Sequence, residues 1–337
     1  MRSFSLALRA TVAAAMLAGC SGNYVTAPSK APISVIPPEL RPTRMRQVLS
    51  AIRPFKKKKH IQQGIYAAGV DSSYIFGYAG IDQDNGPPVC LVPSFDTNGI
   101  SVDSKGDMLS TDAEGGFVSI APGPNLCGSP GYVIYTRGGM PVDAASNDAL
   151  TGSIAVAMYG VYYGKGGIDV CTLSPSSCTL LTNPNIPVVV AVAMAKNGDC
   201  WADGGGSPRG PGVLVYFQGC SGSGQLASGF QGAPFGGLDI DRHGNLVAVD
   251  QEGFLYVYKG CNPVCKLVGG PFGLYGGSAY GKVNKQADLL AIGDFENGQI
   301  DIYYYAPTGI DYEYSITNGL SGGDEIEGAA FAPRSPE

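Results

Sequence analysis

Short apolar runs alternate with glycine-bearing turns along most of the chain. The clearest stretch is 236–269, where Leu246–Asp250 and Phe254–Tyr258 stand on either side of a turn at 251–253. Runs of valine, leucine and tyrosine separated by such turns are typical of half-buried antiparallel strands. The pattern therefore predicts many short strands and no long helix.

The turns recur with a fixed period. Gly106, Gly152, Gly198 and Gly244 stand 46 residues apart, and similar phrases surround three of them, at 102–109, 193–200 and 240–247. A period in the forties built from short strands is the signature of a β-propeller, because one four-stranded blade cannot bury its faces alone.

The repeat also predicts how the ring closes. We expect inner strands near 99–103, 142–148, 187–195, 237–241, 277–283 and 327–333. Three strands precede the first of these, and one strand, at 327–331, is left over at the end. Pairing that last strand with the N-terminal three removes the exposed sheet edges. We predict an all-β, six-bladed β-propeller of four-stranded antiparallel blades over residues 63–337, with five or seven blades as alternatives because 143–173 is degenerate.

The N-terminus has the pattern of an export signal. Arg2 and Arg9 accompany a short apolar run that ends in Leu17-Ala-Gly-Cys20. The run is too short to span a membrane, and its end resembles the bacterial lipobox. We therefore predict that residues 1–19 are a lipoprotein signal peptide and that Cys20 carries lipid; an ordinary secretory signal is the alternative. Ser21 after the cysteine favours the outer membrane or cell surface over the inner membrane.

Residues 20–62 are expected to be a tether, proline-rich at first and then basic. They carry nine basic side chains and one acidic one, although the net charge of the chain is −6. The basic run at 41–59 suits an anionic membrane surface beside the lipid, or it is a solvated spacer. The remainder is acidic, which argues against nucleic acid as a partner. We expect a monomer.

Eight cysteines remain once Cys20 is set aside, an even number that suits an oxidising compartment. Spacing between adjacent strands predicts three local disulfides, and the fourth pair links neighbouring blades. The predicted pairs are Cys171–Cys178, Cys261–Cys265, Cys200–Cys220 and Cys90–Cys127. No Cys-x-x-Cys occurs, and His60 and His243 are the only histidines, so a zinc or redox site is not expected.

The phrase Leu246-Val-Ala-Val-Asp250, followed by Phe254-Leu-Tyr-Val-Tyr258, resembles the NHL-repeat and streptogramin-lyase-like group of six-bladed propellers. The resemblance covers 63–337 as architecture. Such families include extracellular binding scaffolds, lactonases and a lyase, so the resemblance leaves function open. The lyase is expected to need a histidine base, whereas His243 stands in a turn.

Aspartates end the second strand of five blades, at Asp71, Asp112, Asp203, Asp250 and Asp294. One interpretation is a ring of carboxylates that holds Ca²⁺ or a cationic ligand. The other, favoured by the repetition, is that each carboxylate accepts hydrogen bonds from its own turn.

Polar residues that break the repeat near the inner-strand entrances are the candidates for a binding site at the channel mouth. They are Asp96, Asn98, Asp143, Asn185, Asp324 and Glu327. Calcium lactonases of the propeller class use Glu, Asn and Asp at such entrances, although these residues match no lactonase motif one by one. No catalytic residue is assigned.

The leading hypothesis is a surface-tethered propeller, not an enzyme, that binds a protein, peptide or glycan without a resident cofactor. Its expected binding face carries residues 96–98 and the glycine-rich loop at 204–212. The alternative is a calcium-dependent hydrolase or lactonase acting at the channel mouth. A third hypothesis is a structural part of an envelope assembly.

Overall fold

The computed structural model describes residues 64–332 apart from ten short segments. Those segments are 70–71, 81–85, 95–96, 124–126, 138, 161–165, 206–211, 233–235, 277 and 321–324. The predicted signal peptide, Cys20, the tether and His60 lie outside the described residues, as do Asp71, Asp96, Asp324 and most of the 204–212 loop.

The described part of the chain is built from strands, with one 3₁₀ turn at Gln218–Cys220. The strands are β1 (Ile65–Gly69), β2 (Tyr74–Tyr78), β3 (Cys90–Pro93), β4 (Ile100–Val102), β5 (Met108–Asp112), β6 (Phe117–Ala121), β7 (Tyr132–Tyr135), β8 (Met140–Ser146), β9 (Ser153–Tyr159), β10 (Gly167–Leu173), β11 (Ser176–Leu181), β12 (Val188–Met194), β13 (Cys200–Gly205), β14 (Val213–Phe217), β15 (Gln225–Leu226), β16 (Leu238–Ile240), β17 (Leu246–Val249), β18 (Phe254–Lys259), β19 (Lys266–Gly273), β20 (Ser278–Val283), β21 (Leu289–Asp294), β22 (Gln299–Ala306), β23 (Gly309–Ile316) and β24 (Ile326–Phe331).

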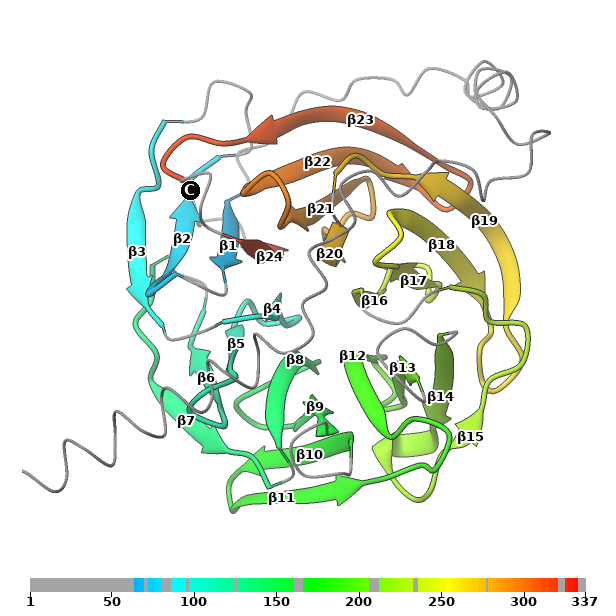
Figure 1. Cartoon of the computed structure of the whole chain (residues 1–337). Helices are drawn as coiled ribbons and strands as arrows, with labels where there is room; N and C mark the ends of the chain where they lie inside the picture. Colours follow the sequence, from blue (N-terminus) through cyan, green and yellow to red (C-terminus); the bar gives the residue numbers. More distant parts are fainter. Residues whose placement is uncertain are drawn as a thin grey trace, which may run out of the picture. The chain divides into compact units, whose positions relative to one another are not determined.

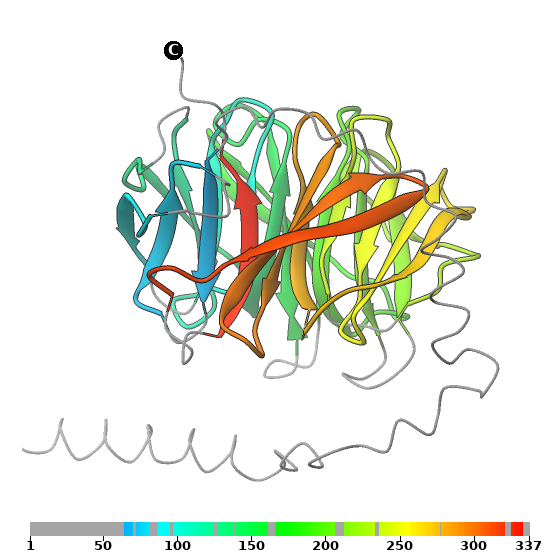
Figure 2. The ribbon, with the colours of Figure 1, turned by 90° about the horizontal axis from the view of Figure 1, so that it is seen from above.

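Consecutive strands pair into antiparallel sheets of four. The four-stranded sheets are β4–β7, β8–β11, β12–β15 and β16–β19, and the rest form an eight-stranded sheet in the order β23-β22-β21-β20-β24-β1-β2-β3. Figure 1 shows the sheets arranged around a common centre, with β4, β8, β12, β16, β20 and β24 nearest to it. In the perpendicular view the strands cross the described unit from one face to the other (Figure 2). The predicted inner strands are therefore confirmed as strands and as the central ones.

The eight-stranded sheet contains the joint between the two ends of the fold. β24 pairs with β1 in antiparallel register from Ile65↔Phe331 to Gly69↔Ile326. On its other side β24 meets β20 through one parallel pair, Tyr280↔Gly328. The predicted pairing of the last strand with the first is confirmed, and it leaves neither terminal strand with an open inner edge.

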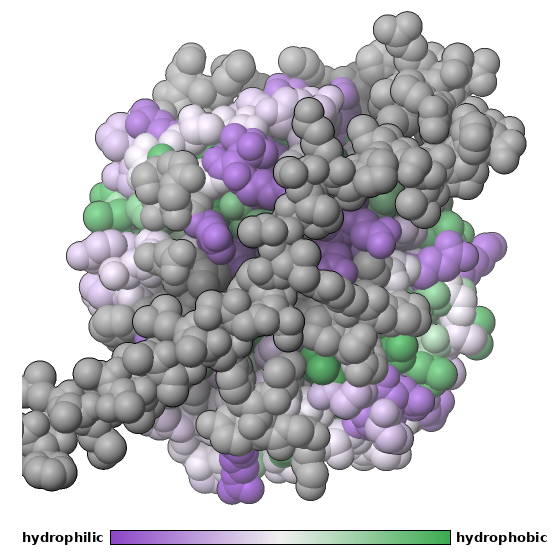
Figure 3. Space-filling model, in the orientation of Figure 1, coloured by the Kyte–Doolittle hydropathy of each residue, from purple (hydrophilic) through white to green (hydrophobic). Residues whose placement is uncertain are grey.

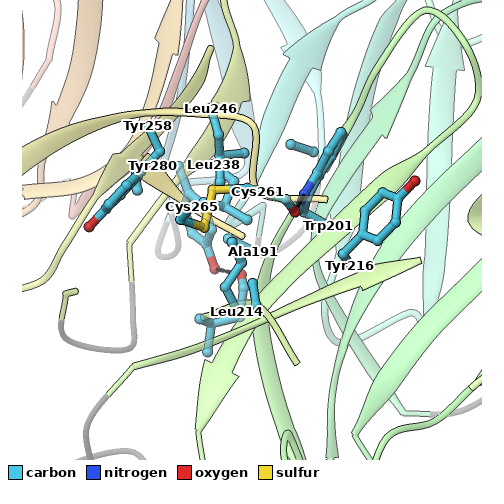
Figure 4. Packing of buried hydrophobic residues seen from close by; sticks show 14 of the residues in the cluster. Ala191, Trp201, Leu214, Tyr216, Leu238, Leu246, Tyr258, Cys261, Cys265 and Tyr280 are labelled. Carbon is cyan, nitrogen blue, oxygen red and sulfur yellow. Dashed lines mark hydrogen bonds between the residues drawn. A yellow bond between two sulfur atoms is a disulfide. The ribbon is translucent and has the colours of Figure 1, made fainter. Parts of the chain in front are cut away.

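Apolar side chains fill the space between neighbouring sheets. Figure 4 shows one such layer, in which Trp201 and Leu214 pack with Leu238, Leu246 and Tyr258 of the next sheet. The Trp201 indole Nε1–H donates to the carbonyl oxygen of Cys261 at 2.7 Å, so the buried polar atom of the ring is satisfied. Burial of each large side chain contributes roughly 1.5–3 kcal/mol, which explains why a single sheet does not suffice.

The turns between first and second strands explain the sequence period. Asp103 Oδ1 accepts the backbone N–H groups of Gly106 and Asp107 at 2.9 and 3.0 Å. Gly106, Gly198 and Gly244 have φ of 96°, 87° and 77°, which is the left-handed region that glycine adopts without a Cβ penalty. The glycine is therefore a requirement of these three turns, whereas Gly152 in the β8–β9 turn does not have a positive φ.

The four disulfides that the cysteine spacing predicts are all present. They are Cys90–Cys127, Cys171–Cys178, Cys200–Cys220 and Cys261–Cys265. Three lie within one sheet or its loops, and Cys90–Cys127 links the β1–β3 strands to the neighbouring β4–β7 sheet.

The joint at β24 predicts a sensitive glycine. A Cβ added at Gly328 would meet the backbone oxygen of Asn98 at 2.7 Å and Ile100 Cγ2 at 2.9 Å. We expect Gly328→Ala to reduce the free energy of unfolding by about 1–3 kcal/mol, because the inner strands must move apart. Gly86→Ala is the control, since a Cβ there meets nothing within 4 Å. Equal urea midpoints for the two variants would contradict the described packing of β24.

Candidate functional site

The centre of the described sheets holds a buried ion pair. Lys282 of β20 places its Nζ 3.3 Å from Asp143 Oδ1 of β8, and both side chains are almost wholly buried. The same ammonium donates to the carbonyl oxygen of Leu238 in β16 at 2.9 Å. One lysine thus connects three inner strands that are far apart in sequence.

Two carboxyl groups share the neighbourhood of this lysine. Asp143 Oδ2 accepts the N–H of Val192 at 3.0 Å, and Asp239 Oδ2 accepts the N–H of Val283 at 2.7 Å. Burial raises the pKa of Asp143, and the positive charge of Lys282 opposes that rise. Burial also raises the pKa of Asp239 to about 6, with Lys282 opposing and Asp143 adding to the rise. The positive charge of Lys282 therefore stabilises the charged forms of both carboxyl groups at the centre of the ring.

A second set of polar residues lies at the start of β24. Asn98 Nδ2 donates to Glu327 Oε2 at 2.7 Å across two segments that are 229 residues apart. Asn98 Oδ1 is buried and has no hydrogen-bond partner within the described part of the chain. Tyr280, whose hydroxyl donates to the carbonyl oxygen of Val190 at 2.9 Å, has its pKa raised by burial first and then by the charge of Glu327.

The structure thus brings together only some of the residues expected at a channel mouth. Asn98 and Glu327 are hydrogen-bonded to each other, and Asp143 has the partner Lys282. Asn185 instead donates to Asn183 Oδ1 at 2.9 Å, in the loop that leads into β12. A single site formed by all of them stays a prediction, since Asp96 and Asp324 are not described.

Sequence reasoning did not select Lys282, Asp239 or Tyr280. A signal was available for Lys282, because a lysine in the run Ser278–Val283 would have to be buried if that run is an inner strand. Lysine is almost never fully buried without a partner. Its partner could not be identified in advance, because Asp143 is 139 residues away.

The aspartates at the second-strand ends mostly serve their own turns. Asp112 Oδ1 accepts from Gly115 N–H at 2.6 Å, and Asp250 Oδ1 accepts from Phe254 N–H at 2.9 Å. Asp294 accepts from the backbone and side chain of Asn297. Asp203 differs, because its Oδ1 has no hydrogen-bond partner among the described residues; burial raises the pKa of this carboxyl well above the usual range. The turn interpretation therefore holds for Asp112, Asp250 and Asp294.

The outer strands of two neighbouring sheets expose apolar side chains. We call this set the β3–β7 patch; it consists of Val89, Leu91, Tyr132, Val133 and Tyr135, which are between 45% and 72% exposed. The Cys90–Cys127 disulfide, with its Cα atoms 5.7 Å apart, ties the β3 segment to the one that leads into β7. In the view of Figure 3 the apolar areas of the described residues are small and scattered over the face.

Comparisons with known proteins identify the fold. No protein-family model matches the sequence, and no curated protein matches it. Among solved structures, the nidogen/laminin complex contains a chain that is 13% identical, with a TM-score of 0.62 over 81% of this chain and 100% of that one.

Two further structures belong to proteins described as of unknown function. One, from Bacteroides caccae, is 11% identical with a TM-score of 0.53, covering 81% of this chain and 99% of that one. The other, from Desulfotomaculum acetoxidans, is 11% identical with a TM-score of 0.50 and covers 80% and 84%. The similarity to nidogen and the four-stranded sheets together show a β-propeller-like fold. Among the described residues, no helix has the length and apolarity needed to span a membrane.

The buried ion pair predicts a large effect of one substitution. We expect Lys282→Met to lower the free energy of unfolding by about 3–5 kcal/mol, because it leaves Asp143 buried without its cation. Adding Asp143→Leu should recover part of the loss, since the carboxylate that lost its ion-pair partner is then removed. Lys259→Met, at an exposed lysine, is the control. Chemical denaturation of the wild type and the three variants measures their free energies of unfolding. A Lys282→Met variant as stable as Lys259→Met would contradict the stabilising role of the ion pair.

The raised pKa of Asp239 predicts a pH dependence. The carboxyl titrates at about 6 in the folded state and near 3.8 in the unfolded one, so the folded chain binds more protons between those values. Stability should therefore fall as pH rises from about 4 to about 6. Thermal midpoints across that range should drop less in Asp239→Asn than in the wild type. The exposed Asp311→Asn is the control, and an unchanged slope in Asp239→Asn would contradict the assignment.

Proposed function

We propose that this chain is an exported binding or scaffold protein, built as a six-bladed propeller and tethered to a bacterial envelope through lipid on Cys20. Four disulfides are typical of proteins in an oxidising environment outside the cytosol. Six groups of four strands follow one another along the chain, namely β24 with β1–β3, β4–β7, β8–β11, β12–β15, β16–β19 and β20–β23. This grouping supports six blades. The NHL-like phrase remains the basis of the finer family assignment.

The β3–β7 patch is the observation that carries this proposal. Outer strands are sheet edges, and proteins protect such edges with charges, prolines or very short strands. Here β15 has two residues, β19 begins with a lysine and contains a proline, and β23 carries Asp311 and Glu313. By contrast β7 has the sequence Tyr-Val-Ile-Tyr, three of whose four side chains are exposed.

The side chains of the β3–β7 patch indicate what kind of partner surface would bind there. Neither β3 nor β7 contains a charged residue, so the partner surface is uncharged and apolar. Exposed tyrosines are enriched at protein–protein interfaces. An extended segment of a partner protein that adds to the open edge of β7 would satisfy both the backbone groups and the side chains. The nidogen structure, a complex with laminin, shows that a propeller of this shape occurs in a protein complex.

One observation favours the second candidate, a calcium-dependent hydrolase. The buried Oδ1 of Asn98, which has no hydrogen-bond partner among the residues that the structure describes, lies close to the carboxylate of Glu327 at the start of the inner strands. Oxygen atoms of this kind are calcium ligands. The ion pair with Lys282 weighs against including Asp143 in such a site, because its carboxylate already has a cation. Turnover of a panel of lactones that Glu327→Gln abolishes would support this function.

A charge placed in the patch tests the binding function. We expect Val133→Lys to weaken partner capture from envelope extracts by about tenfold or more, since burying an unpaired ammonium costs more than the roughly 1.4 kcal/mol that a tenfold change represents. Val264→Lys, at another exposed valine, is the matched control.

A photo-crosslinking residue at position 135 should label the same partner, whereas one at position 264 should not. Equal labelling at both positions, or full capture by Val133→Lys, would overturn the assignment of the patch.

A further inference from the structure

Three carboxyl groups meet between two neighbouring sheets, away from the site described above. Asp103 and Asp107 stand in the β4–β5 turn, and Asp148 stands in the β8–β9 turn of the next sheet. One oxygen atom of each lies within 4.8 Å of the others. Asp103 and Asp107 are buried, whereas Asp148 is partly accessible to solvent.

One buried carboxylate oxygen of this cluster receives no hydrogen bond from the described residues. Asp103 accepts four backbone N–H groups, with Oδ2 taking that of Ala149 at 2.7 Å from the neighbouring sheet. Asp107 Oδ1 accepts from Gly123 N–H at 2.7 Å. Asp107 Oδ2 is fully buried and has no hydrogen-bond partner among the described residues, and the residue is only 3% exposed. A buried anionic oxygen without a partner is costly.

The same turn elsewhere in the chain provides an internal comparison. In the turn that contains Gly198, alanine replaces the first aspartate, and Asp199 Oδ2 accepts from the Tyr216 hydroxyl at 2.9 Å and from Asn197 at 2.7 Å. In the turn that contains Gly244, Asn245 replaces the second aspartate, and its amide donates to Asp241 at 2.8 Å. Each of these turns keeps one carboxylate with donors, whereas the β4–β5 turn combines two and receives a third from the next sheet.

Within the described part of the chain, the cluster lacks a compensating side-chain cation at its buried end. Hydrogen bonds from Thr151 lower the pKa of Asp148, the accessible member, and the charge of Lys105 adds to that lowering. Burial raises the pKa of Asp103, and the charge of Asp107 adds to the rise. Like charges this close in a protein interior need a counter-charge or a proton.

We propose that Asp103, Asp107 and Asp148 bind a calcium ion that bridges the β4–β7 and β8–β11 sheets. Oxygen atoms that lie within 4.8 Å of one another can share one cation at Ca–O distances of roughly 2.3–2.6 Å, and a site built from several protein carboxylates suits Ca²⁺ better than Mg²⁺, which usually keeps several of its waters. Asp107 Oδ2 supplies the ligand atom that has no other partner, and the accessible Asp148 supplies the route of entry. Three protein carboxylates completed by water give the weak affinity of extracellular modules, on the order of 10⁻⁴–10⁻³ M.

The bound ion would strengthen the ring where its sequence repeat is least regular. The β8–β11 sheet contains the degenerate stretch at 143–173, and its contact with β4–β7 includes the bond from Ala149 to Asp103. A cation shared by both turns would hold this interface closed. Calcium then acts on stability, independently of any partner at the β3–β7 patch.

Calorimetric titration of CaCl₂ into EDTA-treated full-length protein tests the proposal. We expect binding of one ion with Kd of roughly 10⁻⁴–10⁻³ M and a higher thermal midpoint in about 5 mM Ca²⁺, whereas Mg²⁺ gives neither. Asp107→Asn should weaken binding by at least about tenfold. Without calcium it should melt at or above the wild-type temperature, because it removes a buried charge. Asp148→Asn, at the accessible position, should weaken binding without loss of the fold.

Matched variants distinguish this cluster from the other acidic groups of the chain. Asp199→Asn, at the equivalent position of another turn, and Glu327→Gln, at the channel mouth, should keep the calcium response. No binding by the wild type at about 10 mM Ca²⁺, roughly ten times the weakest expected Kd, would overturn the proposal. So would an unchanged calcium response in both Asp107→Asn and Asp148→Asn, or a response lost in Glu327→Gln. If the wild type does not respond to calcium and Asp107→Asn is more stable than the wild type, a shared proton and not a metal ion offsets the negative charge of the cluster, and the proposal is wrong.

Discussion

Every sheet of this ring relies on the pairing of β24 with β1. Each sheet of four strands has two apolar faces, and each face can be buried only against a neighbour. A linear stack would leave the first and last sheets with uncovered faces and open edges. Joining the last strand to the first three places every described sheet between two others around the centre (Figure 1). The cluster in which Trp201, Leu238 and Tyr258 are buried together is one example of the packing that follows (Figure 4).

A ring brings inner strands together at its centre, and polar groups there must be satisfied by one another. Lys282 meets Asp143 and the backbone of Leu238 in this way, so polar groups from three sheets compensate one another inside the protein. Both partners of this ion pair are needed, because removing either one leaves the other as an unpaired buried charge. Lys282 and Asp143 are almost wholly buried, whereas Asn98 and Glu327, which are hydrogen-bonded to each other, are partly accessible to solvent.

The candidate interaction sites of this fold lie where the repeat is broken. The aspartates that recur at second-strand ends accept hydrogen bonds from their own turns, which is a structural role repeated with the sheets. The β3–β7 patch and the cluster at Asp103 each occur at one place in the repeat. The first exposes apolar side chains where other outer strands are short, polar, or carry charged residues or proline. The second collects three carboxylates where equivalent turns hold one. Both are therefore better candidates for interaction than the repeated features.

Local patterns in the chain were enough to predict the all-β class, the 46-residue period, the inner strands and the four cysteine pairs. Glycine adopts the positive φ of the turns at Gly106, Gly198 and Gly244, and cysteines on adjacent strands lie opposite each other, as Cys171 and Cys178 do. Which polar residues meet became evident only from the folded ring. Lys282 finds Asp143 across 139 residues, Asn98 finds Glu327 across 229, and Asp148 joins Asp103 from another sheet. Such contacts depend on how far each sheet is rotated about the centre, and no local pattern encodes that rotation.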